Sequence, residues 1–94
     1  MKIRFLMDED SGLPHIYNHG VDEDEVYEVL HHPIEDRKTR NDARSASGQT
    51  GDGRYLRVIY SHDPEPNSVF VITAYDLTGK ALHALKRHKR KKRL

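Results

Sequence analysis

Apolar and β-branched residues are concentrated in two runs in the second half of the chain. Residues 55–60 and 69–75 are apolar at nearly every position apart from Arg57, as expected of strands in the middle of a sheet. A polar segment with two prolines, residues 62–68, separates the two runs. Residues 54–76 are therefore predicted to form a hairpin at the centre of a small sheet.

Shorter segments predict the remaining strands. Residues 3–7 are an apolar run that fits a first strand, and residues 34–41 fit a weak edge strand or a loop. Small residues at 43–50 end at a Gly-Asp-Gly turn signal over residues 51–53, so another hairpin strand is expected there. The sheet should have four to five strands, and it should be mainly antiparallel because the links are short.

Two helices are predicted between the first strand and the hairpins. Gly20 is placed to end the first helix, and Asp22 forms a capping box with Glu25 at the start of the second. Each helix has apolar residues at the spacing of one buried face. These residues are Leu13, Ile16 and Tyr17 in the first helix and Val26, Val29 and Leu30 in the second.

The chain ends in a basic helix. Ala81, Leu82 and Leu85 form a short apolar stripe on it before the charged residues begin. These elements together predict a single α+β domain over residues 1–94, with the two helices N-terminal to the hairpins and the basic helix after them. For the basic tail at residues 89–94 two interpretations stay open, a frayed and disordered end or part of a ligand-binding surface.

Charge is distributed unevenly, although the net charge is only +1. Residues 8–28 carry eight Asp or Glu and no Lys or Arg, whereas residues 80–94 carry eight Lys or Arg and no Asp or Glu. This asymmetry favours a polyanion as a partner of the basic end. The absence of cysteine excludes disulfides and thiol catalysis, and no apolar run is long enough to span a bilayer. We therefore expect a cytoplasmic protein with no membrane partner.

Two histidines are candidates for a metal site. His15 and His19 are four residues apart, a separation that places two imidazoles side by side on a helix. No glutamate follows His15 as in the zinc-protease pattern, so a third ligand would have to come from another part of the fold. We therefore expect neither a metal nor another cofactor, and we interpret His19 as a partner of its own helix end and the following turn.

A second set of residues combines cations, histidines and tyrosines on the predicted strands and the basic helix. RNA can be cleaved by attack of a 2′-hydroxyl on the adjacent phosphate. This reaction needs a base, an acid and cations that stabilise the phosphorane, and these side chains can supply all three without a metal. The tyrosines are equally ordinary in a sheet. The candidate catalytic residues are Arg44, Arg54, His62, Tyr75 and His83, and the candidate nucleic-acid-binding residues are Arg57, Lys86, Arg87, Lys89 and Arg90.

Several short motifs follow one another in a recognisable order. They are His19-Gly20 before an acidic helix, Arg44, Gly48, Gly53-Arg54 ahead of a strand, the sequence at residues 71–74, and the basic C-terminal helix. Over roughly residues 15–90 this order resembles the BrnT-type toxins of bacterial toxin–antitoxin systems and a closely related group of short uncharacterised proteins. The resemblance implies a RelE-like fold and a metal-independent endoribonuclease that a cognate antitoxin neutralises.

By position, His19, Arg44 and Arg54 match the recurring His and Arg of that family. Two positions depart from its pattern, because Asn18 replaces a basic residue before His-Gly and Tyr75 stands where the family places an arginine. A phenol with an ordinary pKa of about 10 carries no positive charge, although it can donate a hydrogen bond or stack on a base.

Three functions stay open. The first is a toxin-like endoribonuclease that cleaves mRNA, with phosphate stabilised by arginines and with Tyr75 and a histidine as acid and base. It requires Arg44, Arg54, Tyr75 and His83 to converge in the fold. The second is a non-catalytic module of the same fold that binds RNA or the ribosome. The third is an interaction protein in which the acidic N-terminal helix of one copy meets the basic tail of another, which would give a homodimer.

Overall fold

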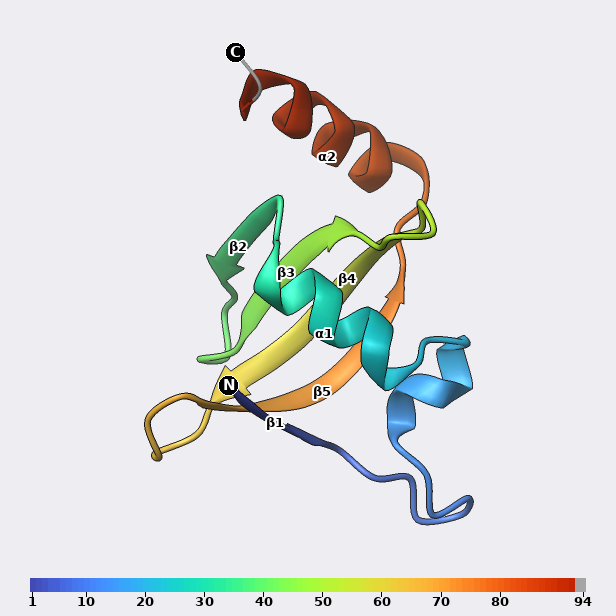
Figure 1. The fold of residues 1–94 in the computed structure, drawn as a ribbon, viewed down its shortest axis with the longest axis vertical. Helices are drawn as coiled ribbons and strands as arrows, with labels where there is room; N and C mark the ends of the chain where they lie inside the picture. Colours follow the sequence, from blue (N-terminus) through green and yellow to red (C-terminus); the bar gives the residue numbers. More distant parts are fainter. Residues whose placement is uncertain (93–94) are drawn as a thin grey trace.

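A five-stranded mixed sheet forms the centre of the computed structural model, which describes residues 1–92 (Figure 1). Its strand order is β1-β5-β4-β3-β2, with β1 parallel to β5 and the other neighbours antiparallel. The α+β class and the central hairpin are thereby confirmed, with β4 in the middle of the sheet. The elements are β1 (Lys2–Phe5), the 3₁₀ helix η1 (His15–His19), α1 (Glu23–His31), β2 (Glu35–Lys38), β3 (Arg44–Gln49), β4 (Tyr55–His62), β5 (Ser68–Asp76) and α2 (Gly79–Lys92).

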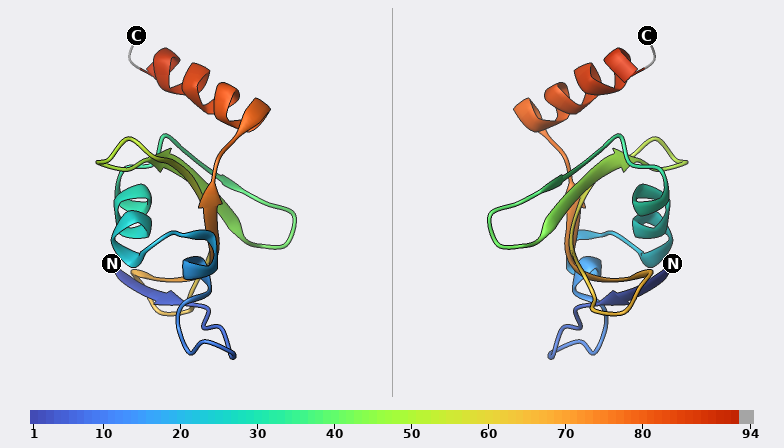
Figure 2. Two further views of the ribbon diagram at one scale, coloured as in Figure 1. Left: turned by 90° about the vertical axis from the view of Figure 1, so that its right-hand side faces the viewer. Right: turned by 90° about the vertical axis from the view of Figure 1, so that its left-hand side faces the viewer.

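The hydrophobic core lies between one face of the sheet and the two elements η1 and α1. Side chains alternate between the two faces of a strand, and the apolar residues of β4 and β5 that point to this face are fully or almost fully buried. In Figure 2, α1 lies on this side of the sheet, whereas α2 projects beyond one end of it. The core consists of Ile16, Val21, Val26, Val29, Ala46, Leu56, Val58, Tyr60, Val69, Val71 and Ala74.

The start of α1 follows the sequence prediction. The Asp22 carboxylate accepts a hydrogen bond from the backbone N–H of Glu25 at 2.9 Å, and the Glu25 carboxylate accepts one from the backbone N–H of Asp22 at 3.1 Å. This reciprocal pair is the predicted capping box, which satisfies two N–H groups that a helix end leaves open. Val26 and Val29 are fully buried, so the predicted core face of α1 is confirmed.

The first predicted helix is wrong in type and in its buried face. The segment is the short 3₁₀ helix η1, in which Ile16 is buried, whereas Leu13 and Tyr17 are exposed. The reason is that residues 6–15 fold back on themselves before the helix begins. Backbone N–H groups of Asp8 and His15 donate to the carbonyls of Leu13 and Leu6, both at 2.8 Å, so this stretch cannot continue a helix. Gly20 ends η1 in the left-handed region with φ 69°, as predicted.

Helix α2 follows β5 after a short link and lies mainly outside the core. Its apolar side chain Leu85 is buried, and Ala81 and Leu82 are half-buried. The helix includes residues 89–92 of the predicted tail, and residues 93 and 94 lie outside the described part of the chain. None of the helices in residues 1–92 is both long and apolar enough to cross a membrane.

Candidate nucleic-acid interface

Strand register decides which of the predicted site residues share a face of the sheet. Arg57 pairs with Ser47 on β3 and with Tyr75 on β5, so these three side chains point to the same face. Their neighbours Val58 and Ala74 are in the core, which places Arg57 and Tyr75 on the face opposite α1. We call this face the open face.

Arg44 lies on the other face, where it is part of an ion pair. Its Nε donates to Asp36 Oδ1 at 3.0 Å, and the Tyr60 hydroxyl donates to Asp36 Oδ2 at 2.6 Å. Burial, followed by the neighbouring Asp36 carboxylate, raises the pKa of Tyr60 to about 12. The exposed His62 follows on the same face, with its ring centroid 5.7 Å from that of Tyr60.

Arg54 is held by carboxylates and carbonyls at the opposite end of β4. It binds Asp76 with two hydrogen bonds, from Nε to Oδ1 at 2.7 Å and from Nη2 to Oδ2 at 2.9 Å. Its Nη1 donates to the carbonyl of Gly20 at 2.7 Å and to both carboxylate oxygens of Glu25 at 3.0 and 3.1 Å. Hydrogen bonding to Asp76 raises the pKa of Arg54 and lowers that of Asp76. A phosphate would have to compete with two carboxylates for this guanidinium.

The predicted catalytic cluster is therefore not assembled. Arg54 is separated from Tyr60, the cross-strand partner of Arg44, by six positions along β4, or about 20 Å. Tyr75 is on the open face, and His83 is on α2. Strand alternation and distance along β4 divide Arg44, Arg54 and Tyr75, so the four residues that had to converge do not. His62, the other candidate histidine, lies on the same face as Arg44.

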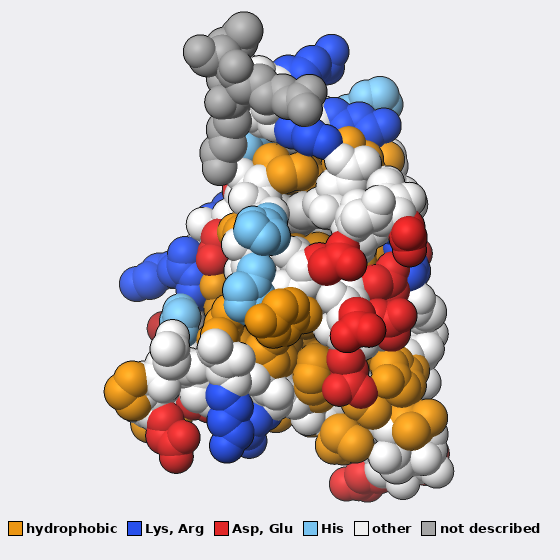
Figure 3. All heavy atoms as spheres, viewed as in Figure 1, with side chains coloured by type: hydrophobic (Ala, Val, Ile, Leu, Met, Phe, Trp, Pro, Cys, Tyr) orange, Lys and Arg blue, Asp and Glu red, His pale blue; other side chains and the backbone are white. Residues whose placement is uncertain are grey.

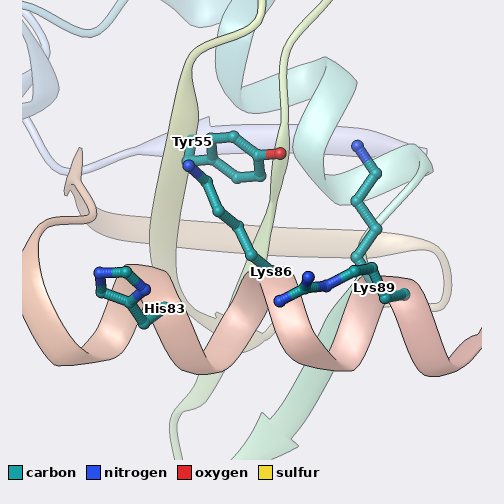
Figure 4. A pocket seen from close by; sticks show the side chains of 5 residues that line it. Tyr55, His83, Lys86 and Lys89 are labelled. Carbon is teal, nitrogen blue, oxygen red and sulfur yellow. The ribbon is translucent and has the colours of Figure 1, made fainter.

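A different group of predicted residues does come together around Tyr55. An open hollow of about 450 Å³ is lined by this tyrosine of β4 and four basic or histidine side chains of α2. Figure 4 shows Lys86 and Lys89 extending from α2 toward the ring, with Nζ atoms 5.4 and 5.6 Å from its centroid. Lys89 also donates a hydrogen bond to Gln49 of β3. The lining residues are Tyr55, His83, Lys86, Lys89 and Arg90.

The cations of α2 within residues 1–90 differ in their partners from four arginines elsewhere, namely Arg4, Arg37, Arg44 and Arg54. Among residues 1–90, every Lys or Arg in an ion pair lies outside α2. Lys80, Lys86, Arg87 and Arg90 are exposed and face no carboxylate in that part of the chain. Figure 3 shows Lys and Arg side chains gathered over α2, whereas acidic side chains gather over α1. The positive charge that α2 carries within residues 79–90 is thus not neutralised by an ion pair in residues 1–90.

A second group lies on the open face. A smaller hollow of about 240 Å³, on another side of α2, is lined in part by Arg57 and Leu85. Arg57 donates from Nε to Ser47 Oγ at 3.3 Å, and its neighbour Tyr75 has its ring 6.3 Å from that of His19. Arg57, Tyr75 and His19 are therefore neighbours. No pattern in the sequence indicates that His19 lies beside Tyr75, because η1 comes to lie beside β5 only in the fold.

Histidines elsewhere do not form a metal site in the described residues. The rings of His15 and His19 lie edge to face with centroids 5.4 Å apart, and no group of three or more His, Asp or Glu within residues 1–92 is placed to hold a metal ion. His15 instead lies within 3.4 Å of the Asn18 amide, which donates to Asp8 Oδ2 at 2.7 Å. That bond, together with backbone N–H groups, lowers the pKa of Asp8.

The fold and its surface define a small α+β protein with a basic helix beside an open sheet face. Residues 15–76, about two thirds of the chain, match the family described as a domain of unknown function (DUF4258), and the chain belongs to this family. No curated protein and no solved structure matches it. The matched segment contains η1, α1 and β2 to β5, so β1 and α2 lie outside it.

Proposed function

We propose that this protein is a non-catalytic module that binds single-stranded RNA through α2 and Tyr55. The observation that carries the proposal is a group of cations, without carboxylate partners in residues 1–90, beside the half-buried ring of Tyr55. Single-stranded nucleic acid is bound in general by a positive surface along the backbone together with aromatic rings on which bases stack. The surface of α2 and Tyr55 has both components.

The geometry of α2 suits a phosphate backbone. His83, Lys86 and Arg90 are three and four residues apart, so they lie on one side of the helix. A helix of 14 residues is about 21 Å long, which is enough to meet several phosphates. A base can stack on Tyr55 when Lys86 and Lys89 move from the ring to phosphates, because a cation–π contact that is not fully desolvated contributes only about 1 kcal/mol.

Fluorescence anisotropy with a labelled single-stranded RNA, measured over a range of salt concentrations, tests the proposal. We expect Lys86→Gln with Arg90→Gln to weaken binding and to lower the slope of log K against log salt by about 1.4, since each lost phosphate contact removes about 0.7. The matched control is Arg37→Gln with Lys38→Gln, which removes the same charge from β2. An equal loss in both variants would mean that net charge, and not α2, binds the RNA.

A second candidate function is the toxin-like endoribonuclease, favoured by the neighbouring Arg57, Tyr75 and His19. In such an enzyme Arg57 would stabilise the phosphorane, His19 would accept the 2′-hydroxyl proton, and Tyr75 would donate to the leaving oxygen. The resemblance to BrnT-type toxins, with mRNA as substrate and an antitoxin as partner, supports this candidate. It also implies a RelE-like fold, and a cytoplasmic location remains the expectation from the sequence.

Incubation of the protein with mRNA in the presence of EDTA separates the two candidates. The enzyme should leave fragments that end in 2′,3′-cyclic phosphate, and Tyr75→Phe or His19→Asn should abolish them. His62→Asn is the matched control, because His62 is an exposed histidine on the other face. Intact RNA at every protein concentration, combined with tight binding, would exclude the endoribonuclease and support the non-catalytic module.

A further inference from the structure

A cluster of exposed apolar side chains lies at the end of the molecule opposite α2. Leu6, Met7, Leu13 and Tyr17 are 40, 51, 49 and 39% exposed, which is unusual for large apolar residues so close together in the chain. Exposed acidic residues lie on both sides of them, on the segment after β1 and in the first turn of α1. We call this the N-terminal surface; its acidic members are Glu9, Asp10, Glu23 and Asp24.

The N-terminal surface is ordered by backbone hydrogen bonds. The N–H of Leu6 donates to the carbonyl of Val71 on β5 at 2.8 Å, and Met7 pairs with Pro14 in an isolated bridge. The Tyr17 hydroxyl donates to Glu23 Oε1 at 2.8 Å, which joins the apolar cluster to α1. Figure 3 shows hydrophobic and acidic side chains side by side in this part of the molecule. The surface is thus preformed for a partner.

Within residues 1–90, its carboxylates are in no ion pair, and neither are the cations of α2. None of the ion pairs in the described part of the chain includes an acidic residue of the N-terminal surface. The two unmatched surfaces lie at opposite ends of a molecule whose longest extent is 42 Å, so they do not meet within one copy (Figure 1). A second copy of the chain carries the complementary charge for each surface.

We infer that the N-terminal surface of one copy binds α2 of a second copy. Lys and Arg side chains cover apolar surface with their alkyl stems while their charged ends stay in water or meet carboxylates. The exposed side of α2 is rich in such side chains, so it suits a surface that is apolar in the middle and acidic at the rim. A two-fold arrangement makes this contact twice, once in each direction. The inference does not depend on RNA binding.

Sedimentation equilibrium of the full chain tests this contact. We expect the mass of a dimer at a salt concentration of about 25 mM and that of a monomer at about 500 mM, because contacts between exposed charges are screened by salt. Leu13→Ser should raise the dissociation constant, since it removes apolar surface without changing charge. A monomer at both salt concentrations would overturn the inference.

Charge reversal with mixing identifies the two surfaces. Glu9→Lys with Asp10→Lys, and separately Lys80→Glu with Arg87→Glu, should each weaken self-association by about tenfold or more, because like charges then face each other. A mixture of the two variants should associate again, because the reversed charges are complementary.

The matched control reverses two exposed acids elsewhere, Asp52→Lys with Glu65→Lys, and should leave the dimer intact. Self-association that survives reversal of the N-terminal surface, or that the control weakens equally, would show that another surface or net charge is responsible. Failure of the mixture to associate would also overturn the inference. Circular dichroism confirms that each variant is folded, and all replaced side chains are exposed.

Discussion

Arg4 and Arg54 carry the same charge as the cations of α2, but the two groups differ in their partners. Arg4 and Arg54 each bind a carboxylate with two hydrogen bonds, and these partners lie 59 and 22 positions away in the sequence. Lys86 and Arg87 face no carboxylate in residues 1–90. The comparison teaches that the charge available to a polyanion is decided by pairing in the fold and not by the count of Lys and Arg.

The largest change in the free energy of unfolding is expected for Arg54→Gln. The substitution leaves Glu25 and Asp76 without their cation and the Gly20 carbonyl without a donor, so the free energy of unfolding should fall by about 2 to 3 kcal/mol. Urea unfolding followed by circular dichroism measures it. Arg54→Lys should recover only part of the loss, because an ammonium group cannot bind both carboxylates in this geometry. An unchanged urea midpoint would show that Arg54 does not stabilise the fold.

A smaller loss of stability is expected at Asp36, whose carboxylate accepts hydrogen bonds from Arg44 and Tyr60. Tyr60→Phe removes one hydrogen bond to this carboxylate from a nearly buried ring, and it should lower the free energy of unfolding by about 1 kcal/mol. The same urea experiment measures the change. Tyr27→Phe is the control, because the Tyr27 ring is half-exposed and stacks on His31. Equal losses in both variants would contradict a specific role for the Tyr60 hydroxyl.

The pairing of Arg4 with Asp63 predicts a pH dependence. Hydrogen bonds from Arg4 and then from Ser68 lower the pKa of Asp63 from 3.8 to about 2. A depressed pKa means that the folded state favours the ionised form, so this stabilisation is present above pH 3.8 and is lost as the pH falls toward 2. Asp63→Asn should therefore flatten the decline of the urea midpoint over this range. A variant as steep as the native protein would refute the assignment.

The smallest change in the free energy of unfolding is expected for the cations of α2 that face no carboxylate in residues 1–90. Lys80→Gln with Arg87→Gln should change the free energy of unfolding by no more than about 0.5 kcal/mol, since both side chains are exposed and face no carboxylate in residues 1–90. Thermal and urea unfolding measure it beside Arg54→Gln. A loss as large as that of Arg54→Gln would erase the distinction between the two groups of cations.

Local patterns in the sequence predicted most of the fold. The capping box at Asp22 and the hairpin of β4 and β5 depend on residues that are close in the chain, so spacing and β-branched composition were sufficient. The parallel pairing of β1 with β5 was not predictable in this way, because it joins segments more than 60 residues apart. The exposure of Leu13 and Tyr17 was missed because helical spacing alone does not show that the preceding segment folds back.

The site was predicted in part for the same reason. The basic residues of α2 form one run in the sequence, and three of them, Lys86, Lys89 and Arg90, line one hollow with Tyr55. The role of Arg54 was assigned to phosphate because its charge is visible in the sequence, whereas Glu25 and Asp76, 29 and 22 positions away, are not visible as its partners. His19 and Tyr75 likewise become neighbours only because η1 lies against β5 in the fold.

The hydrogen bonds of Arg54 also bear on how the protein is divided into parts. The matched family segment covers residues 15–76, and this one guanidinium joins Gly20, near its beginning, to Asp76, its last residue. Arg54 thereby holds the two ends of the segment next to each other. The chain on either side therefore leaves the segment at neighbouring points, and α2 contacts the sheet again through the buried Leu85 and the hydrogen bond from Lys89 to Gln49.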